Sequence, residues 1–223
     1  MKKLLQGIVD YRNHVLPDYR ERYAALAGGQ SPDSLFISCS DSRVEPSLVA
    51  SSDPGDLFVM RNAGNLVPIA HASGHSTGDE SEAAGIEYAL LALGVTDIVV
   101  CGHSSCGAMK AVLDGKLPPN TPNLEAWLRH GVPALDMLRA KGPIDASRPE
   151  HDQLSQWNVL VQLEHVRSYP IVQEFLTKNA IRLTALWFEI ASGIVYAFDE
   201  EERKYQEICG DFARKLLARY DLH

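Results

Sequence analysis

Two short polar clusters, residues 39–43 (CSDSR) and residues 102–107 (GHSSCG), contain the side chains best suited to chemistry in this sequence. Each cluster directly follows an apolar, β-prone run, at 35–37 and at 98–100. Open parallel sheets carry their chemistry where the strands end. We therefore expect Cys39 and His103 to project from the carboxyl ends of two strands, with Cys106 one turn into the following helix.

Cys39, His103 and Cys106 make a ligand set that suits zinc. Catalytic zinc sites use three protein ligands and leave a fourth position open, and soft thiolates favour zinc over magnesium or calcium. His103 and Cys106 stand three residues apart, which places them on one face if a helix begins there. A lone cysteine usually packs in a core, which is our interpretation of Cys101 and Cys209. The other three residues together predict a metal site.

The composition indicates a globular protein of ordinary size. A chain of 223 residues suits one α/β domain with peripheral helices. Its 21 basic and 29 acidic residues give a net charge of −8 without a basic stripe, so no nucleic-acid partner is expected. Apolar runs are far too short to span a membrane, and the N-terminus has no signal-peptide pattern. Four cysteines, three of them close to the proposed metal site, fit a reducing compartment with metal binding better than disulfides, so we expect a cytoplasmic protein.

Short strands that alternate with helices predict an α/β fold with a mainly parallel central sheet of four to five strands, flanked by helices. The expected strands are 34–38, 56–61, 97–101, 181–188 and 194–198. The expected helices are 44–50, 80–93, 108–113, 124–139, 152–166, 171–178 and 211–220. Residues 1–28 are interpreted as a helical arm interrupted at Pro17, and residues 29–223 as the zinc-binding catalytic domain.

The pattern Cys39-x-Asp41-x-Arg43, followed by His103-x-x-Cys106, resembles the zinc-site signature of the β-class carbonic anhydrases. The two motifs in this order are far more specific than either motif alone. The resemblance implies that the two cysteines and the histidine bind zinc. It also implies that the aspartate and arginine form a dyad that orders the zinc-bound water.

The resemblance runs without interruption from about residue 30 to about residue 114, and more weakly to about residue 199. It implies reversible hydration of CO2 to bicarbonate and a proton, with zinc-bound hydroxide attacking CO2. Asp41 would accept a hydrogen bond from the hydroxide, or would ligate zinc itself and close the site. Closing members of the family carry a tryptophan where this chain has Phe36, so we expect an open resting site.

By its likeness to the plant and cyanobacterial branch of the family, the substrate pocket is lined by Gln30, Phe58 and Tyr88. The backbone N–H of Gly107 would help to hold a substrate oxygen. The pocket should be largely apolar, because CO2 offers no charge to bind. The two aromatic residues are equally consistent with ordinary core packing. Arg61 either binds bicarbonate or pairs with an acidic neighbour.

The resemblance also implies that the arm packs across a partner subunit, giving a homodimer or a dimer of dimers. The alternative is an arm that lies on its own domain. Two other functions share the same ligands: hydrolysis of CS2 or COS on the same scaffold, and a non-catalytic protein that zinc stabilises. The dyad and the open fourth position argue against the second, because structural zinc usually has four protein ligands.

Overall fold

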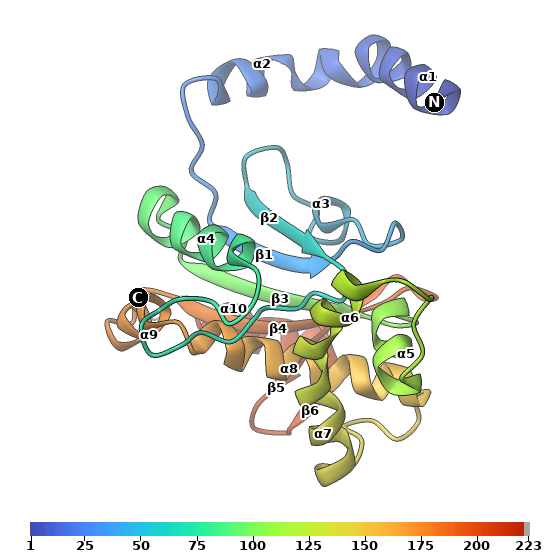
Figure 1. Cartoon of the computed structure of the whole chain (residues 1–223). Coiled ribbons are helices and arrows are strands. Elements are labelled where there is room, and N and C mark those ends of the chain that lie inside the picture. The colour runs from blue at the N-terminus through green and yellow to red at the C-terminus, as the bar shows by residue number, and fades with distance from the viewer. Residues whose placement is uncertain (221–223) are drawn as a thin grey trace.

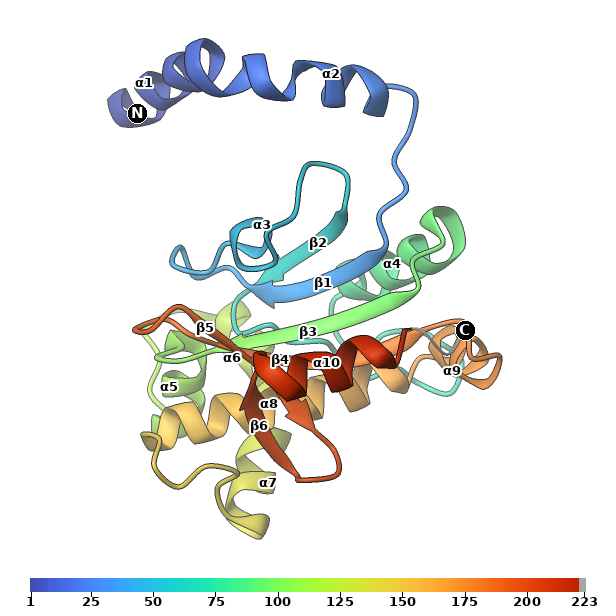
Figure 2. The same ribbon diagram turned by 180° about the vertical axis from the view of Figure 1, so that it is seen from behind.

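A six-stranded sheet forms the centre of the protein, seen here in a computed structural model that describes residues 1–220 (Figures 1 and 2). The strand order is β2-β1-β3-β4-β5-β6; the first four strands are parallel, and β5 and β6 are antiparallel to their neighbours. The last three residues of the expected domain, 221–223, lie outside this description. The strands are β1 (Ser34–Cys39), β2 (Leu57–Asn62), β3 (Asp97–His103), β4 (Arg182–Glu189), β5 (Ile194–Asp199) and β6 (Lys204–Glu207).

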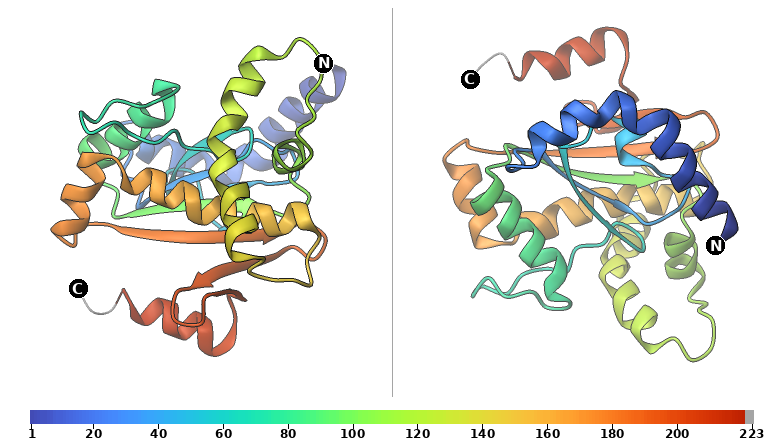
Figure 3. Two further views of the ribbon diagram at one scale, coloured as in Figure 1. Left: turned by 60° about the horizontal axis from the view of Figure 1, so that its bottom comes forward. Right: turned by 90° about the horizontal axis from the view of Figure 1, so that it is seen from above.

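Helices cover both faces of this sheet (Figure 3). The long helix α8 packs on one face with α4, α5 and α7, and α10 lies on the opposite face. No helix within residues 1–220 is both long enough and apolar enough to cross a membrane. The helices are α1 (Lys2–Asp10), α2 (Leu16–Leu26), α3 (Pro46–Val49), α4 (Glu80–Tyr88), α5 (Gly107–Asp114), α6 (Pro122–Leu128), α7 (Val132–Lys141), α8 (Glu150–Arg167), α9 (Pro170–Thr177) and α10 (Gly210–Ala218).

The apolar run of β1 is buried on both sides, as expected for a parallel strand between two helical layers. Successive side chains of a strand point to opposite faces. Leu35 and Ile37 accordingly join the core on the side of α8, whereas Phe36 joins a smaller apolar cluster on the other side. Cys39 continues the first series and therefore points into the layer that contains α5 and α8.

The connections of the sheet reverse direction beside β1. The chain passes from β1 to β2 on one side and then crosses β1 through α4 to reach β3 on the other. Ligand sites in open α/β sheets lie at such a switch point, outside the carboxyl ends of the strands. Cys39 and His103 are the last residues of the two strands that flank it.

The sheet has one strand more than the sequence predicted. β6 (KYQE) has no alternating apolar pattern, and it pairs with β5 only at the edge of the sheet. The single helix expected over 124–139 is also wrong, because a turn of 3-10 helix at Arg129–Gly131 separates α6 from α7. Pro133 lies at the start of α7 and has no backbone N–H, so it cannot donate the hydrogen bond to Arg129 that a continuous helix would contain.

The arm formed by α1 and α2 stands away from the sheet (Figure 1). A short π-helical turn at Tyr11–Val15 joins the two helices, and Pro17 begins α2. No residue of either helix is buried within the described chain. Arg22 attaches the arm to the body by an ion pair with Asp56 and a hydrogen bond to the Pro54 carbonyl. The arm's exposed apolar side chains include Leu4, Leu5, Ile8, Val9 and Val15.

Gly102 gives a test of how closely α8 packs on β3. A Cβ atom at this position would lie 2.5 Å from Cγ2 of Val159, closer than real contacts allow. We expect Gly102→Ala to lower the free energy of unfolding by about 1–3 kcal/mol, the usual cost of overpacking a core. The measurement is the denaturant midpoint. Gly28→Ala is the control, because nothing lies within 4 Å of its Cβ, and equal midpoints for the two variants would contradict the close packing.

Candidate metal centre

Cys39, His103 and Cys106 meet at the carboxyl edge of the sheet, with their ligand atoms all within 4.8 Å of one another. The first two residues end β1 and β3, and the third is the N-cap of α5. All three side chains are buried. The structure therefore brings together the three residues that the sequence singled out as ligands. Cys106 is the N-cap of α5 and does not lie one turn into it, and His103 ends a strand, so the expectation that the two share a helix face was wrong.

The imidazole of His103 is arranged to ligate a metal through Nε2. Its Nδ1 lies 2.9 Å from the carbonyl oxygen of Ser104, a contact that fits an Nδ1–H donor and leaves a lone pair on Nε2. Nε2 is buried and has no hydrogen-bond partner within the described residues. A buried polar atom without a partner is costly. Zinc beside two sulfurs satisfies it, so the donor set fits this metal.

The two sulfurs form a coupled pair. A hydrogen bond between Cys106 and Cys39 is the main cause that lowers the pKa of Cys39, to about 4. The same interaction, together with burial, raises the pKa of Cys106. In the absence of a metal this interaction favours the charged form of Cys39 and the neutral form of Cys106. Both sulfurs are deprotonated when they ligate a metal, so zinc binding is accompanied by release of protons.

Gly64 supplies a backbone donor to the same thiolate. Its N–H donates to Sγ of Cys39 at 3.4 Å. Gly64 has a φ of 90°, and a Cβ atom there would lie 2.9 Å from Cβ of Ala108. Both the conformation and the close approach require glycine. Sequence reasoning did not indicate this contact.

The carboxylate of Asp41 is held on both oxygens by Arg43. Nε of Arg43 donates to Oδ1 at 2.9 Å, Nη2 donates to Oδ2 at 2.7 Å, and the backbone N–H of Arg43 adds a third bond at 3.0 Å. The guanidinium holds the pKa of Asp41 well below its usual range. Nη2 also donates to the carbonyl of Ser105 at 3.2 Å, which connects the pair to the His103–Cys106 loop.

Arg61 holds the backbone that carries Asp41. From β2 its guanidinium donates to the carbonyls of Cys39, Asp41 and Val44, at 3.2, 2.9 and 2.5 Å. Its contact with the carboxylate of Glu45 is longer, at 3.5 Å. The sequence left bicarbonate and an acidic neighbour as alternatives for this arginine. The three carbonyl contacts show a role in shaping the loop that the sequence did not indicate.

Helix α8 holds the loop between the other two ligands. Oδ1 of Asp152 accepts the N–H of Ser105 at 2.5 Å, and Ser155 donates its hydroxyl to the carbonyl of His103 at 2.8 Å. Ser105 has a φ of 54°, a left-handed conformation that is uncommon for serine. The only signal in the sequence was that Asp152 and Ser155 stand three residues apart, on one face of a helix.

Phe58 and Tyr88 pack together, with ring centroids 5.8 Å apart. They lie away from the metal ligands of their own chain. Phe58 is in register with Leu35, four residues before Cys39 on β1, which is about 13 Å along a strand. Within one chain, the structure does not bring these two predicted pocket residues to the metal centre.

Of the other two predicted pocket residues, Gly107 adjoins the metal ligand Cys106, whereas Gln30 lies on the segment before β1. Gly107 is the first residue of α5, directly after Cys106, so its N–H has no partner inside the helix. A Cβ atom at Gly107 would meet nothing within 4 Å, which means that open space adjoins it. Gln30 lies exposed in the segment between the arm and β1.

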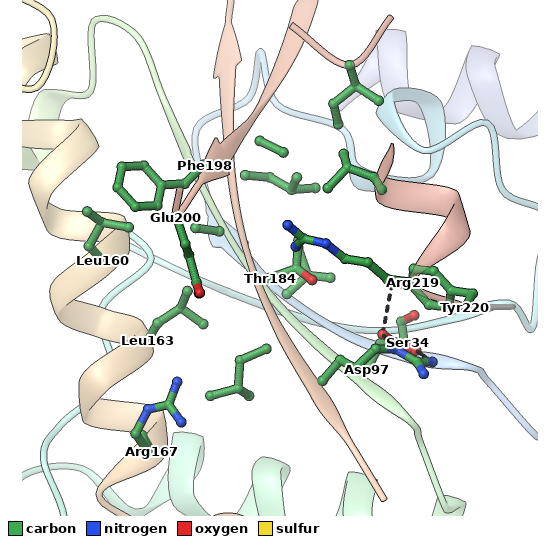
Figure 4. A pocket seen from close by; sticks show the side chains of 18 of the residues that line it. Ser34, Asp97, Leu160, Leu163, Arg167, Thr184, Phe198, Glu200, Arg219 and Tyr220 are labelled. Carbon is green, nitrogen blue, oxygen red and sulfur yellow. Dashed lines mark hydrogen bonds and ion pairs between the residues drawn. The ribbon is translucent and has the colours of Figure 1, made fainter. Parts of the chain in front are cut away.

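A cavity of about 590 Å³ lies between α8, β4 and α10 (Figure 4). Leu163 and Phe198 line one part of it, and Thr184 lines another. At its edge Tyr220 donates to a carboxylate oxygen of Asp97 at 3.0 Å. None of the three metal ligands lines this cavity. The chemistry of the ligands, rather than cavity size, therefore identifies the functional site.

Comparison with known proteins identifies the family. The family model described as carbonic anhydrase matches residues 34–195. The chain is 37% identical over 206 residues to a carbonic anhydrase of Pseudomonas aeruginosa, and the aligned region covers 92% of this chain and 90% of that protein. It is 39% identical over 200 residues to a carbonic anhydrase of Synechococcus elongatus, and this alignment covers 87% of this chain and 70% of that protein.

Solved structures agree with these relatives. The β-carbonic anhydrase CcaA has a TM-score of 0.84 at 34% identity, over 94% of this chain and 92% of that chain. A tetrameric β-carbonic anhydrase of Sordaria macrospora has a TM-score of 0.72 at 27% identity, over 88% and 95% of the two chains. The fold and the cysteine–histidine–cysteine centre define a zinc-dependent lyase. This chain belongs to the β-class carbonic anhydrase family.

The ligand assignment predicts which cysteines matter for zinc. Cys39→Ala, His103→Ala and Cys106→Ala should each lose the metal, because two ligands are too few to hold it. Cys101→Ser and Cys209→Ser should keep close to one zinc per chain. The measurement is zinc content after dialysis against a chelator. Loss of zinc from the Cys209→Ser variant would show that the ligands are wrongly assigned.

Proposed function

We propose that Cys39, His103 and Cys106 hold a catalytic zinc ion for the reversible hydration of CO2 to bicarbonate and a proton. One observation carries the proposal: three buried ligand atoms converge beside an aspartate whose two oxygens an arginine already holds. When bound, zinc supplies hydroxide near neutral pH for attack on CO2. A structural zinc site would need a fourth protein ligand in place of this arrangement.

Asp41 orients the nucleophile in this proposal. Its Oδ2 lies 4.0 Å from Nε2 of His103, so the carboxylate borders the metal position. Arg43 donates two hydrogen bonds to Oδ1 and one to Oδ2, so Oδ2 keeps a lone pair that can accept a hydrogen bond from the nucleophile. The N–H of Gly107 faces the same edge of the sheet and would donate to a substrate oxygen. Neither role requires a movement of the backbone.

We also propose that the site is open at neutral and alkaline pH. Arg43 lowers the pKa of Asp41 in the folded protein. A depressed carboxyl pKa stabilises the fold above the unfolded value of about 3.9, and this stabilisation is lost as the pH falls through the folded pKa. Asp41 is therefore ionised from neutral pH upward, and its three hydrogen bonds with Arg43 support the open state, because it would have to give them up to turn and ligate zinc. Phe36 supports the open state, because it packs in an apolar cluster and cannot donate a hydrogen bond.

A second copy of the chain would complete the substrate pocket. Tyr88 is half exposed although it packs on Phe58, and both lie too far from the zinc ligands of their own chain. The apolar side of the arm is equally uncovered. A homodimer, or a dimer of dimers, would cover the arm and bring Gln30, Phe58 and Tyr88 to the partner's centre. The tetrameric relative from Sordaria macrospora supports such an assembly.

A cytoplasmic location fits the state of the cysteines. All four cysteines are free thiols in the structure, and two of them must stay reduced to ligate zinc. Thiols persist in reducing compartments, whereas oxidising compartments favour disulfides. We therefore propose that the protein works in the cytoplasm, a reducing compartment.

Stopped-flow CO2 hydration on the purified protein, with zinc content measured on the same sample, tests the proposed activity. Asp41→Asn and Arg43→Ala should keep zinc and reduce hydration by about 10- to 100-fold, the usual effect of losing a partner outside the ligands. The control is Asp145→Asn, which removes an aspartate–arginine pair with Arg148 elsewhere on the surface. Full activity in both dyad variants would leave the dyad a purely structural role.

Light scattering tests the assembly. We expect at least twice the chain mass of 24.6 kDa at micromolar concentration, and a poorly soluble product when residues 1–28 are deleted, because apolar surface is then exposed. Tyr88→Ala should keep zinc and lose CO2 hydration. A fully active protein of single-chain mass would contradict both the assembly and the shared pocket.

A further inference from the structure

We infer that Trp127 and Asn158 position the peptides on either side of Gly64, so that its N–H donates to the Cys39 thiolate and tunes the metal centre. Both are positioning residues, because neither is a zinc ligand and each acts through the backbone of another residue. The inference rests on the proposed role of Cys39 as a zinc ligand.

The peptide between Ala63 and Gly64 is held at both of its ends. The indole Nε1–H of Trp127 donates to the carbonyl of Ala63 at 2.8 Å, and the N–H of Gly64 donates to Sγ of Cys39 at 3.4 Å. These are the C=O and the N–H of a single planar peptide group. Fixing the direction of the carbonyl therefore fixes the direction of the N–H. Hydrogen bonds arranged in such a chain also polarise one another.

The next peptide is held by a buried side chain. Nδ2 of Asn158 donates to the carbonyl of Gly64 at 2.9 Å, and the asparagine is completely buried. Its Oδ1 accepts from Nε2 of Gln162 at 2.9 Å, and Oε1 of Gln162 accepts the N–H of Val67 at 2.8 Å. These contacts fix the orientation of the asparagine amide. Both peptides that flank the α-carbon of Gly64 are thus restrained.

Gly64 needs this restraint because glycine has more backbone freedom than any other residue type. Rotation of the 63–64 peptide would turn its carbonyl oxygen toward the sulfur and remove the N–H donor. A side chain cannot prevent the rotation, because a Cβ atom would clash with Ala108. The hydrogen bonds from Trp127 and Asn158 restrain the peptides around Gly64 in place of a side chain at that position.

The two zinc sulfurs differ in how their backbone donors are fixed. Cys106 is the N-cap residue of α5 and makes no side-chain capping hydrogen bond, but the nearby backbone N–H groups of Ala108 and Met109 act to lower the pKa of its thiol. The helix itself holds those amides in place. Cys39 ends a strand, and the Gly64 amide that it accepts comes from a loop. Side chains from α6 and α8 hold the peptides on either side of that residue.

The test uses cobalt in place of zinc, since the cysteine-to-cobalt charge-transfer band reports the electron density on the sulfur. Trp127→Phe keeps an aromatic ring and removes the indole N–H. We expect the band to shift to longer wavelength and zinc affinity, from chelator competition, to fall about tenfold. Asn158→Ala should change both readouts in the same direction. Unfolding midpoints are measured for both variants.

Trp157→Phe is the matched control, because its indole N–H donates to the carbonyl of Gly142 at 2.8 Å, away from the metal centre. It should leave the band and the affinity unchanged. A Trp127→Phe variant that melts earlier but keeps the wild-type band and affinity would overturn the inference, since its role would then be structural only. A wild-type protein that binds neither metal would instead contradict the proposed zinc site.

Discussion

The whole site depends on two parallel strands that end within one residue of each other. The register of β1 and β3 pairs Ser38 with Cys101, so Cys39 lies one residue beyond this pair on β1 and His103 lies two residues beyond it on β3. A shift of one residue in either strand would turn its ligand to the opposite face of the sheet. Burial of both strands on both faces makes such a shift costly, because their apolar side chains fit two different layers. The ligand geometry is thus a product of the core.

Helix α8 is the second element on which the site depends. Its inner face carries Asp152, Ser155, Asn158 and Gln162, each buried and each bonded to the backbone of a loop beside the centre. A buried polar group that loses its partner costs far more than a satisfied one contributes. These residues therefore favour one arrangement of the loops over all others. Arg61 acts in the same way from β2, on the loop that carries the dyad.

The sequence predicted the ligands because each of the two clusters that contain them follows an apolar run typical of a buried strand. It could not predict the inner face of α8, since the partners of Asn158 and Gln162 are backbone atoms nearly a hundred residues away. Polar residues on a helix are more often solvated, so their pattern was uninformative. The sequence analysis missed β6 for a related reason, since this short charged edge strand has no alternation of apolar and polar residues. The distance of Phe58 from the metal ligands could not be predicted from the sequence, because it depends on the register between β1 and β2.

The unpartnered Nε2 of His103 has a consequence for how much of this enzyme a cell holds in folded form. Without a metal, the buried Nε2 has no partner within the described residues, which lowers the stability of the metal-free folded state. Metal binding removes this penalty. Each tenfold rise of free zinc above the dissociation constant then adds about 1.4 kcal/mol to the stability of the folded state. The abundance of the enzyme would follow zinc supply through proteolysis of the unfolded chain, without any regulator of its synthesis.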